Sequence, residues 1–337
     1  VYGGGTGIVG GAVADGGIVI STSAFNKIKV DVNKKTVEAG SGVLLKDLNG
    51  ELSKHNLWYP VDSTEQTATI GGNVATNAWG TRSFKYGSAR NFVKGIGTVL
   101  PLKKRFSVNR GEIKANGDKF DFLLDGKRIN FSITDLSEKM DMKNNCGYYM
   151  KNEMDITDLF IGAEGTLGII TGVKLKVLDL PWDVYAFMIP FKEKQNAVDF
   201  VGYVKQKEIL SLEYMDHSSV ELLKQKYPVL HDAGCLVFFE MEAQKENEDK
   251  MFDDLYDVTK KFNIEEDSVI ISRTKKKESI VYKIRESLPQ TINEMIRQKK
   301  TQKISTDFAV NDKNFDKMMH IYDNILSDTK IKHFVYG

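Results

Sequence analysis

The sequence predicts an α+β fold in two domains, and three observations lead to this prediction. The chain has 337 residues, enough for two domains of ordinary size that each bury a core. Glycine-rich loops and strand-like segments alternate over the first 180 residues. From residue 181 onward, strand-like segments alternate instead with helices whose apolar residues recur at helical spacing. We therefore expect a domain boundary near residue 180.

The composition is that of an ordinary globular protein. Hydrophobic residues make up 41% of the chain and charged residues 28%, with a net charge of +1. No block of Lys and Arg interleaves with aromatic residues, so we expect no nucleic-acid partner. No signal peptide is visible, and no apolar run approaches the roughly 18 to 20 residues of a membrane span. Two cysteines, Cys146 and Cys235, suit a reducing compartment. The expected location is the cytoplasm, with attachment to a membrane surface left open.

The first element is a glycine-rich loop, VYGGGTGIVGGAVADGG. Gly5, Gly7 and Gly10 spell G-x-G-x-x-G, which in a Rossmann fold opens into a helix that holds a dinucleotide diphosphate. Here further glycines follow up to residue 17, and each costs a helix roughly 1 kcal/mol. We therefore expect an irregular loop over 3–11, whose backbone N–H groups converge on an anion, and then a strand at 18–21. The competing interpretation is a surface turn.

Two further segments have the same character. Residues 58–80, WYPVDSTEQTATIGGNVATNAWG, combine paired glycines with small and amide residues and lack the apolar stripe of a core helix. Residues 161–178, IGAEGTLGIITGVKLKVL, run from a glycine turn into an alternating strand. Three such loops, separated by strands, predict one long ligand that is bound across several loop tips.

These three segments, with KYG at 85–87, resemble in their order the FAD-linked oxidases of the vanillyl-alcohol oxidase type. The similarity is greatest to the branch of D-lactate, glycolate and D-2-hydroxyglutarate dehydrogenases. Three later segments resemble landmarks of the family's substrate domain: LEYMD (212–216), RESLP (285–289) and KISTDFAV (303–310). The resemblance therefore covers nearly the whole chain.

The resemblance implies a domain arrangement. A PCMH-type FAD-binding domain is expected over 1–180, with an insertion at about 103–146, and an antiparallel-sheet cap domain is expected over 181–337. The family's first βαβ unit and the end of its cap domain are missing from the sequence. We therefore expect the chain to be a piece of a longer protein.

The resemblance also implies non-covalent FAD, because the loops contain neither the His nor the Cys to which some members attach flavin. The glycine loop would bind the diphosphate through backbone amides, and the later segments would line the flavin and the adenosine. The implied cofactor-binding residues are Gly3, Gly4, Gly5, Thr6, Gly7, Gly10, Pro60, Asp62, Thr69, Gly71, Gly72, Asn73, Thr76, Tyr86, Gly87, Glu164, Gly165, Gly168 and Ile170.

The second half is expected to form an antiparallel sheet with helices on one side. One helix carries apolar residues at every fourth position, which predicts a core-facing stripe of Ile280, Ile284, Leu288, Ile292 and Ile296. The expected strands are 184–190, 235–242, 268–272 and 304–310, and the expected helices are 192–207, 245–263, 276–298 and 314–327.

Arg285, beside that stripe, is the first candidate for a catalytic role. A guanidinium binds a carboxylate bidentately, and a 2-hydroxy acid offers one. The residues alone favour an ion pair with an acidic neighbour on a solvated helix face, whereas the resemblance of RESLP favours substrate binding. Lys303 is the second candidate for the substrate carboxylate, with Lys299 and Lys300 as alternatives.

The resemblance implies oxidation of a D-2-hydroxy acid of the lactate, glycolate or 2-hydroxyglutarate class to the 2-oxo acid, by hydride transfer to flavin N5. The alternatives are another flavoenzyme of this type, such as an aldonolactone or alcohol oxidase or an ether-lipid synthase, and an inactive binding fragment. The small-molecule acid is the expected partner; the electron acceptor is unassigned and a homodimer is left open.

The catalytic base is unassigned. Hydroxy-acid members carry a G-H-x-G-x-x-x-x-H segment whose histidines bind a divalent metal or act as base, and the chain ends at Tyr336-Gly337, where that segment would begin. We therefore expect no complete metal site within the chain.

Overall fold

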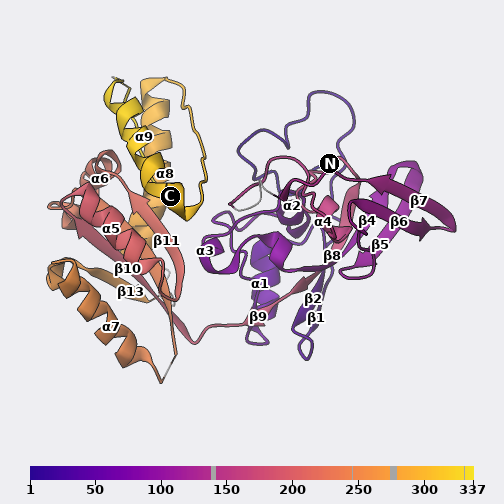
Figure 1. The fold of residues 1–337 in the computed structure, drawn as a ribbon, viewed down its shortest axis with the longest axis horizontal. Helices are drawn as coiled ribbons and strands as arrows, with labels where there is room; N and C mark the ends of the chain where they lie inside the picture. Colours follow the sequence, from indigo (N-terminus) through magenta and orange to yellow (C-terminus); the bar gives the residue numbers. More distant parts are fainter. Residues whose placement is uncertain (138–141, 245, 274–278, 330) are drawn as a thin grey trace. The chain divides into compact units, whose positions relative to one another are not determined.

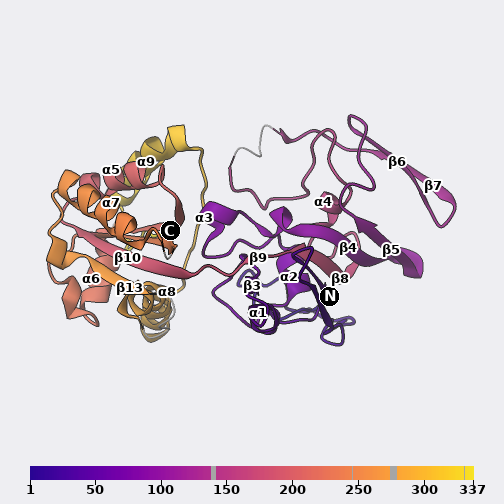
Figure 2. The ribbon, with the colours of Figure 1, turned by 90° about the horizontal axis from the view of Figure 1, so that it is seen from below.

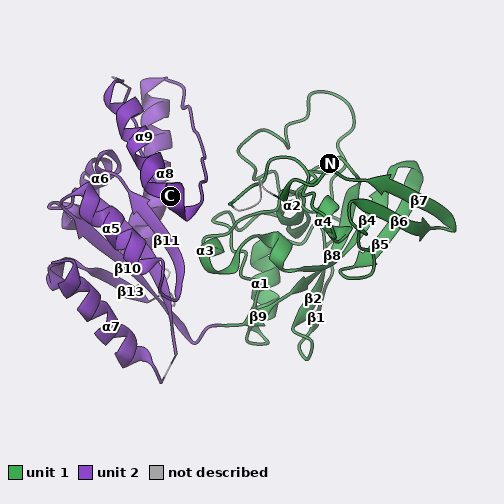
Figure 3. Cartoon of the chain, in the orientation of Figure 1, with its two compact units in different colours: residues 1–180 green, residues 181–337 purple. Residues whose placement is uncertain are grey.

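The computed structural model describes residues 1–137, 142–244, 246–273, 279–329 and 331–337. They form two compact units, Val1–Leu180 (unit 1) and Pro181–Gly337 (unit 2) (Figure 3). Both units combine helices with antiparallel sheets, so the α+β prediction is confirmed. None of the helices in the described part of the chain has the length and apolar character that crossing a bilayer requires.

Unit 1 is built on a five-stranded antiparallel sheet with the order β1-β2-β8-β4-β5 (Figure 1). Side chains alternate between its faces: in β2, Val37 and Ala39 are buried while Glu38 is exposed. The register places Val37 opposite Leu175 and Ala39 opposite Val173, so the buried residues share one face. The strands are β1 (Ile28–Asp31), β2 (Thr36–Gly40), β4 (Val93–Leu100), β5 (Lys104–Asn109) and β8 (Ile169–Lys176).

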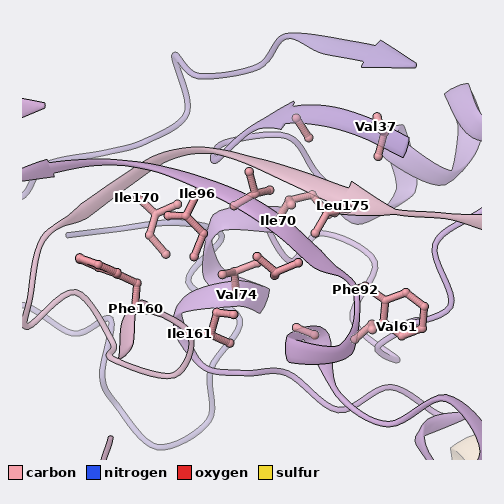
Figure 4. Close-up of a cluster of buried hydrophobic side chains, with 14 of the residues drawn as sticks. Val37, Val61, Ile70, Val74, Phe92, Ile96, Phe160, Ile161, Ile170 and Leu175 are labelled. Atoms are coloured by element: carbon pink, nitrogen blue, oxygen red, sulfur yellow. The ribbon is translucent and has the colours of Figure 1, made fainter. Parts of the chain in front are cut away.

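Short helices and a two-stranded ribbon complete the core of unit 1. In α2, Ile70 and Val74 lie on one side of the helix and pack with Ile96, Ile170 and Leu175 of the sheet (Figure 4). The elements are α1 (Leu45–Ser53), α2 (Ile70–Ala75), α3 (Ser83–Tyr86) and α4 (Thr157–Phe160), with β3 (Leu57–Trp58) paired to β9 (Leu178–Asp179).

The segment that was expected to be an insertion contributes to the sheet. Its first strand, β5, is the sheet's edge, and the next two strands form a separate hairpin, β6 (Lys119–Leu124) and β7 (Lys127–Ser132). Asp125 and Gly126 join them with positive φ angles of 50° and 73°, as a tight Asp-Gly turn requires. Phe122 of the hairpin packs on Phe106 of β5, with ring centroids 6.1 Å apart.

The glycine loop is irregular, as predicted, and no helix follows it. The strand expected at residues 18–21 is wrong, because only Ser21 forms a bridge, to Tyr2, and Ile18 is 91% exposed. A strand needs a neighbour for its backbone groups, and within the described residues Tyr2 is the one bridge partner of this segment.

Unit 2 contains a four-stranded antiparallel sheet with the order β11-β12-β10-β13. The predicted strands at 184–190, 235–242 and 268–272 and all four predicted helices are confirmed within a few residues. The strands are β10 (Asp183–Phe191), β11 (Ile209–Met215), β12 (Cys235–Ala243) and β13 (Ile270–Arg273). The helices are α5 (Lys194–Val204), α6 (His217–Lys224), α7 (Glu248–Lys261), α8 (Ile280–Lys299) and α9 (Phe315–Ser327).

Helices cover both faces of this sheet, so the prediction of helices on one side is wrong. Phe187 and Phe239 pack with α5, α7 and α9, whereas Met188 and Phe238 pack with α6 and α8. Figure 2 shows α5 and α9 on one side of the sheet and α6 and α8 on the other. The reason is that the central strands β10 and β12 carry apolar residues on both faces of the sheet. Each face therefore needs a layer of helices to bury it.

The buried stripe of α8 begins one residue later than predicted. Ile284, Leu288 and Ile292 are buried, but Ile280 is 39% exposed and Val281 takes its place in the core. A helix has 3.6 residues per turn, so a repeat of four drifts around the axis by about 40° at each step. Over several steps the first residue of such a series leaves the core-facing side.

Residues 304–310, expected to be a strand, have no regular structure, so this prediction is wrong. Ile304 is 92% exposed and Phe308 is 62% exposed. Residues 335–337 pair with β11 instead: the Tyr214 N–H donates to the carbonyl of Gly337 at 2.8 Å, and the Asp216 N–H donates to that of Val335 at 2.9 Å. Residues 335–337 therefore occupy the edge of β11 that would otherwise be open to pairing with another strand.

Candidate functional site

Unit 1 contains a cavity of about 210 Å³ where its three glycine-rich segments meet. This volume is below the roughly 300–1,000 Å³ of pockets that enclose a whole small ligand. It is lined by Val1, Gly3, Gly4, Gly5, Thr6, Gly7, Val9, Gly11, Ala12, Thr22, Ser41, Ala68, Thr69, Gly71, Gly72, Asn73, Ala75, Thr76, Glu164, Gly165, Gly168, Ile169 and Ile170.

The glycine loop lies directly against the second segment. A Cβ atom at Gly4 would lie 2.6 Å from the carbonyl oxygen of Thr67, and one at Gly3 would lie 2.5 Å from Oγ1 of Thr69. Gly5 has a φ of +66°, a backbone conformation that residues other than glycine rarely adopt. The loop's glycines therefore allow the main chain to form the cavity wall.

The second segment turns into α2 at the cavity. Oγ1 of Thr69 accepts a hydrogen bond from the N–H of Gly72 at 3.2 Å, which caps the helix. The N–H of Gly71 donates to the carbonyl of Ser41 at 2.9 Å, and a Cβ at Gly71 would lie 2.4 Å from Cβ of Ser41. Gly71 thus lets α2 pack closely on the end of β2.

The third segment is tied to the end of α2. The N–H of Gly162 donates to the carbonyl of Val74 at 3.0 Å, and that of Glu164 donates to Ala75 at 2.9 Å. Glu164 has a positive φ of 51° and is the one ionisable side chain among the lining residues. An anion in this cavity would therefore be bound by N–H and hydroxyl groups, without Lys or Arg.

Most of the predicted cofactor-binding residues meet at this cavity, although five do not. Gly10, Pro60, Asp62, Tyr86 and Gly87 are outside its lining. Thr22 and Ser41 also line the cavity and are not among the predicted residues. The signal for Ser41 is its position between two glycines, Gly40 and Gly42.

The donor groups of the cavity fit a dinucleotide. Oγ of Ser41 and Nδ2 of Asn73 are buried and have no hydrogen-bond partner among the residues that the structure describes. Hydroxyl, amide and backbone N–H groups of this kind can donate to a ligand that carries acceptor oxygens. FAD offers such oxygens on its diphosphate, its ribityl chain and its flavin ring, and the exposed backbone of the glycine loop suits the diphosphate.

Arg285, in unit 2, holds a carboxylate of the protein itself. Its Nε lies 3.0 Å from both carboxylate oxygens of Glu213 in β11, and its Nη2 lies 2.6 Å from Oε1. Both side chains are mostly buried, at 15% and 21% exposure. Burial lowers the pKa of the Arg285 guanidinium, but Glu213, with smaller contributions from Glu240 and Glu286, more than offsets this effect, so the pKa is raised. The acidic neighbour is on strand β11, and the pair is not on a solvated helix face.

Lys303 makes a weaker contact. It lies in the irregular segment after α8, and its Nζ is 3.5 Å from Oδ1 of Asn293. Within the described part of the chain, no three His, Cys, Asp or Glu residues are grouped to hold a metal ion.

Comparison with known families gives the class of the protein. Residues 1–104 match the FAD binding domain family, and residues 181–337 match the C-terminal domain of FAD linked oxidases. The chain therefore belongs to the FAD-linked oxidases, as the resemblance of its glycine-rich segments predicted.

The chain is similar to D-lactate dehydrogenases in particular. It is 36% identical over 232 residues to that of Anaerostipes hadrus, covering 66% of this chain and 42% of the relative. It is 33% identical over 222 residues to that of Archaeoglobus fulgidus, covering 65% and 42%. It thus spans less than half the length of these curated relatives. The solved structure of alkyldihydroxyacetonephosphate synthase shares the fold, with a TM-score of 0.57 at 19% identity over 88% of this chain and 50% of that one.

Replacing Gly71 by Ala is expected to weaken FAD binding at least tenfold. The new Cβ would overlap Ser41 by more than small shifts relieve, so α2 must move away from β2 and widen the cavity. Fluorescence titration of the FAD-free protein with FAD measures the change. Gly50→Ala in α1 is the matched control, because a Cβ there meets no atom within 4 Å. Equal affinities of the two variants would contradict the prediction.

Proposed function

We propose that the protein is an FAD-dependent dehydrogenase or oxidase that converts a D-2-hydroxy acid to the 2-oxo acid. The observation that carries the proposal is the cavity of unit 1, which the main chain of three glycine-rich segments of an FAD-linked oxidase lines together with hydroxyl and amide residues. The choice of substrate class is supported by the D-lactate dehydrogenases among its relatives. In this proposal unit 1 binds the cofactor and unit 2 contributes to the substrate site.

The cofactor is proposed to bind without a covalent bond, because neither His nor Cys is among the cavity's lining residues. Gly3 to Gly7 would hold the diphosphate, and Thr69 to Thr76 and Glu164 to Ile170 would form the remaining walls. When bound, FAD supplies the acceptor for the hydride from C2 of the acid.

Arg285 is proposed to bind the carboxylate of the acid. Glu213 occupies the guanidinium edge formed by Nε and Nη2. A guanidinium has five N–H donors, so the edge formed by Nη1 and Nη2 suits a second, bidentate carboxylate. This contact would fix C2 of the substrate, with Lys303 as an additional cation. The group that takes the hydroxyl proton is not assigned to a residue of this chain.

An absorption spectrum of the purified protein with FAD tests the proposal. A flavin band near 450 nm that bleaches when D-lactate or D-2-hydroxyglutarate is added without oxygen is the expected result. The L-enantiomers serve as controls. A band that no D-2-hydroxy acid bleaches would refute the substrate class, and failure to bind FAD would refute the cofactor.

A further inference from the structure

Glu213 forms the ion pair with Arg285 described above, and the proposed function gives it no role of its own. It lies in β11, directly opposite Phe238 of the neighbouring strand β12. Residues opposite each other in a sheet point to the same face, so the carboxylate and the ring are presented together to α8. The carboxylate accepts hydrogen bonds from Nε and Nη2 of Arg285, and the guanidinium carbon lies 5.5 Å from the centroid of the Phe238 ring.

These two contacts fix the orientation of the guanidinium. Glu213 binds one edge of the planar group, and the fully buried Phe238 ring limits its movement on another side. Among the described residues, Nη1 of Arg285 has no hydrogen-bond partner. A guanidinium has five N–H donors in a fixed plane, so the edge formed by Nη1 and Nη2 keeps one direction while Glu213 holds the opposite edge.

An ion pair in such a place contributes little to the stability of the fold. Both side chains are mostly buried, so the two charges have lost most of their water. This loss roughly offsets their attraction, and well-packed apolar residues in the same place are often as stable. The fixed direction of the guanidinium therefore explains the pair better than stability does.

We propose that Glu213 is a positioning residue for substrate binding, which holds Arg285 so that its Nη1–Nη2 edge receives the carboxylate of the acid. The inference rests on the proposed function, which assigns that carboxylate to Arg285. Glu213 acts through Arg285 and does not itself bind the substrate. A guanidinium that is not held in advance must be ordered when the acid binds, and the entropy lost in that step weakens the contact. Loss of Glu213 is therefore expected to raise KM with little effect on kcat.

A double-mutant cycle with Glu213→Gln and Arg285→Ala tests this role. Glu213→Gln removes the charge with little change of shape and is expected to raise KM for D-lactate about tenfold. In the Arg285→Ala background the same change is expected to leave KM as it is, because no guanidinium remains to be held. It is also expected to raise the thermal midpoint of that background, since it removes a mostly buried carboxylate that has lost its partner. A purely structural role of Glu213 would not give this combination.

Glu248→Gln is the matched control, because Glu248 of α7 pairs with a different arginine of unit 2, Arg273. This variant is expected to leave KM unchanged. Steady-state kinetics at saturating FAD gives KM and kcat for every variant of the cycle. If Glu213→Gln does not fold, Glu213→Asp takes its place, because aspartate keeps the carboxylate but shortens its reach.

The outcomes separate this inference from the proposed function. If the unmodified protein does not oxidise D-2-hydroxy acids, the proposed function fails and the inference fails with it. If KM rises in Arg285→Ala but not in Glu213→Gln, the proposed function stands and the role of Glu213 is refuted. Equal effects of Glu213→Gln with and without Arg285 would also refute it, because Glu213 would then act independently of Arg285.

Discussion

Asp158→Asn is expected to lower the free energy of unfolding of unit 1 by about 3–5 kcal/mol, the cost of breaking a buried ion pair from one side. Asp158 lies between two guanidinium groups: Nη1 of Arg90 is 2.9 Å from Oδ1, and Nη1 of Arg110 is 2.9 Å from Oδ2. The Asp158 side chain is 8% exposed, so water cannot solvate the two guanidinium groups once the negative charge between them is removed. Burial already lowers the pKa of Arg90, and Asp158 opposes that effect.

This change also reaches the cavity. Nη2 of Arg90 donates to the carbonyl of Ile161 at 2.6 Å, at the start of the segment that lines the cavity up to Ile170. We therefore expect weaker FAD binding together with the lost stability. Urea unfolding followed by tryptophan fluorescence measures the stability. Asp121→Asn is the control, because its ion pair with Arg128 lies on the exposed β6–β7 hairpin. Equal unfolding midpoints of the two variants would contradict the prediction.

Arg285→Ala is expected to raise KM for the D-2-hydroxy acid about 100-fold, with a smaller effect on kcat. The loss of a charged bidentate contact to a carboxylate typically costs 2–5 kcal/mol, and about 2.7 kcal/mol corresponds to that factor. Arg285→Lys retains the positive charge but lacks the planar guanidinium that makes two parallel hydrogen bonds, so it is expected to give an intermediate KM. Steady-state kinetics with D-lactate measures both.

The ion pair with Glu213 makes a control necessary. Truncation of Arg285 leaves a mostly buried carboxylate unpaired and lowers stability by itself. FAD content and thermal midpoint are therefore measured with KM. Arg273→Ala is the matched variant in unit 2, because Arg273 pairs with Glu248 and is half exposed. If Arg285→Ala is less stable but has an unchanged KM, Arg285 serves the fold and does not bind the substrate.

The cavity could be foreseen because its chemistry is local. Glycines at Gly3, Gly4 and Gly71 remove Cβ atoms from close main-chain contacts, and the sequence shows such glycines directly. Ser41 stands between two glycines, but its burial between β2 and α2 depends on packing that the sequence does not show. The same holds for Glu213, which lies 72 residues before Arg285 and meets it only through the fold.

The failed predictions for secondary structure have a common cause. Residues 18–21 and 304–310 have strand-like residues, but a strand also needs an adjacent edge, which local sequence does not reveal. In contrast, the apolar residues on both faces of β10 and β12 are visible in the sequence and indicate a layer of helices on each side of the sheet. The drift of a four-residue repeat likewise explains the exposure of Ile280.

The two-sided sheet of unit 2 has a consequence for how this unit unfolds. In β10, Tyr185, Phe187 and Ile189 belong to one core, and Ala186 and Met188 belong to the other. Neither core can open while β10 stays in place, so loss of one removes the support of the other. The two helical layers should therefore melt in a single cooperative step, with the amide hydrogens of β10 among the last to exchange with solvent.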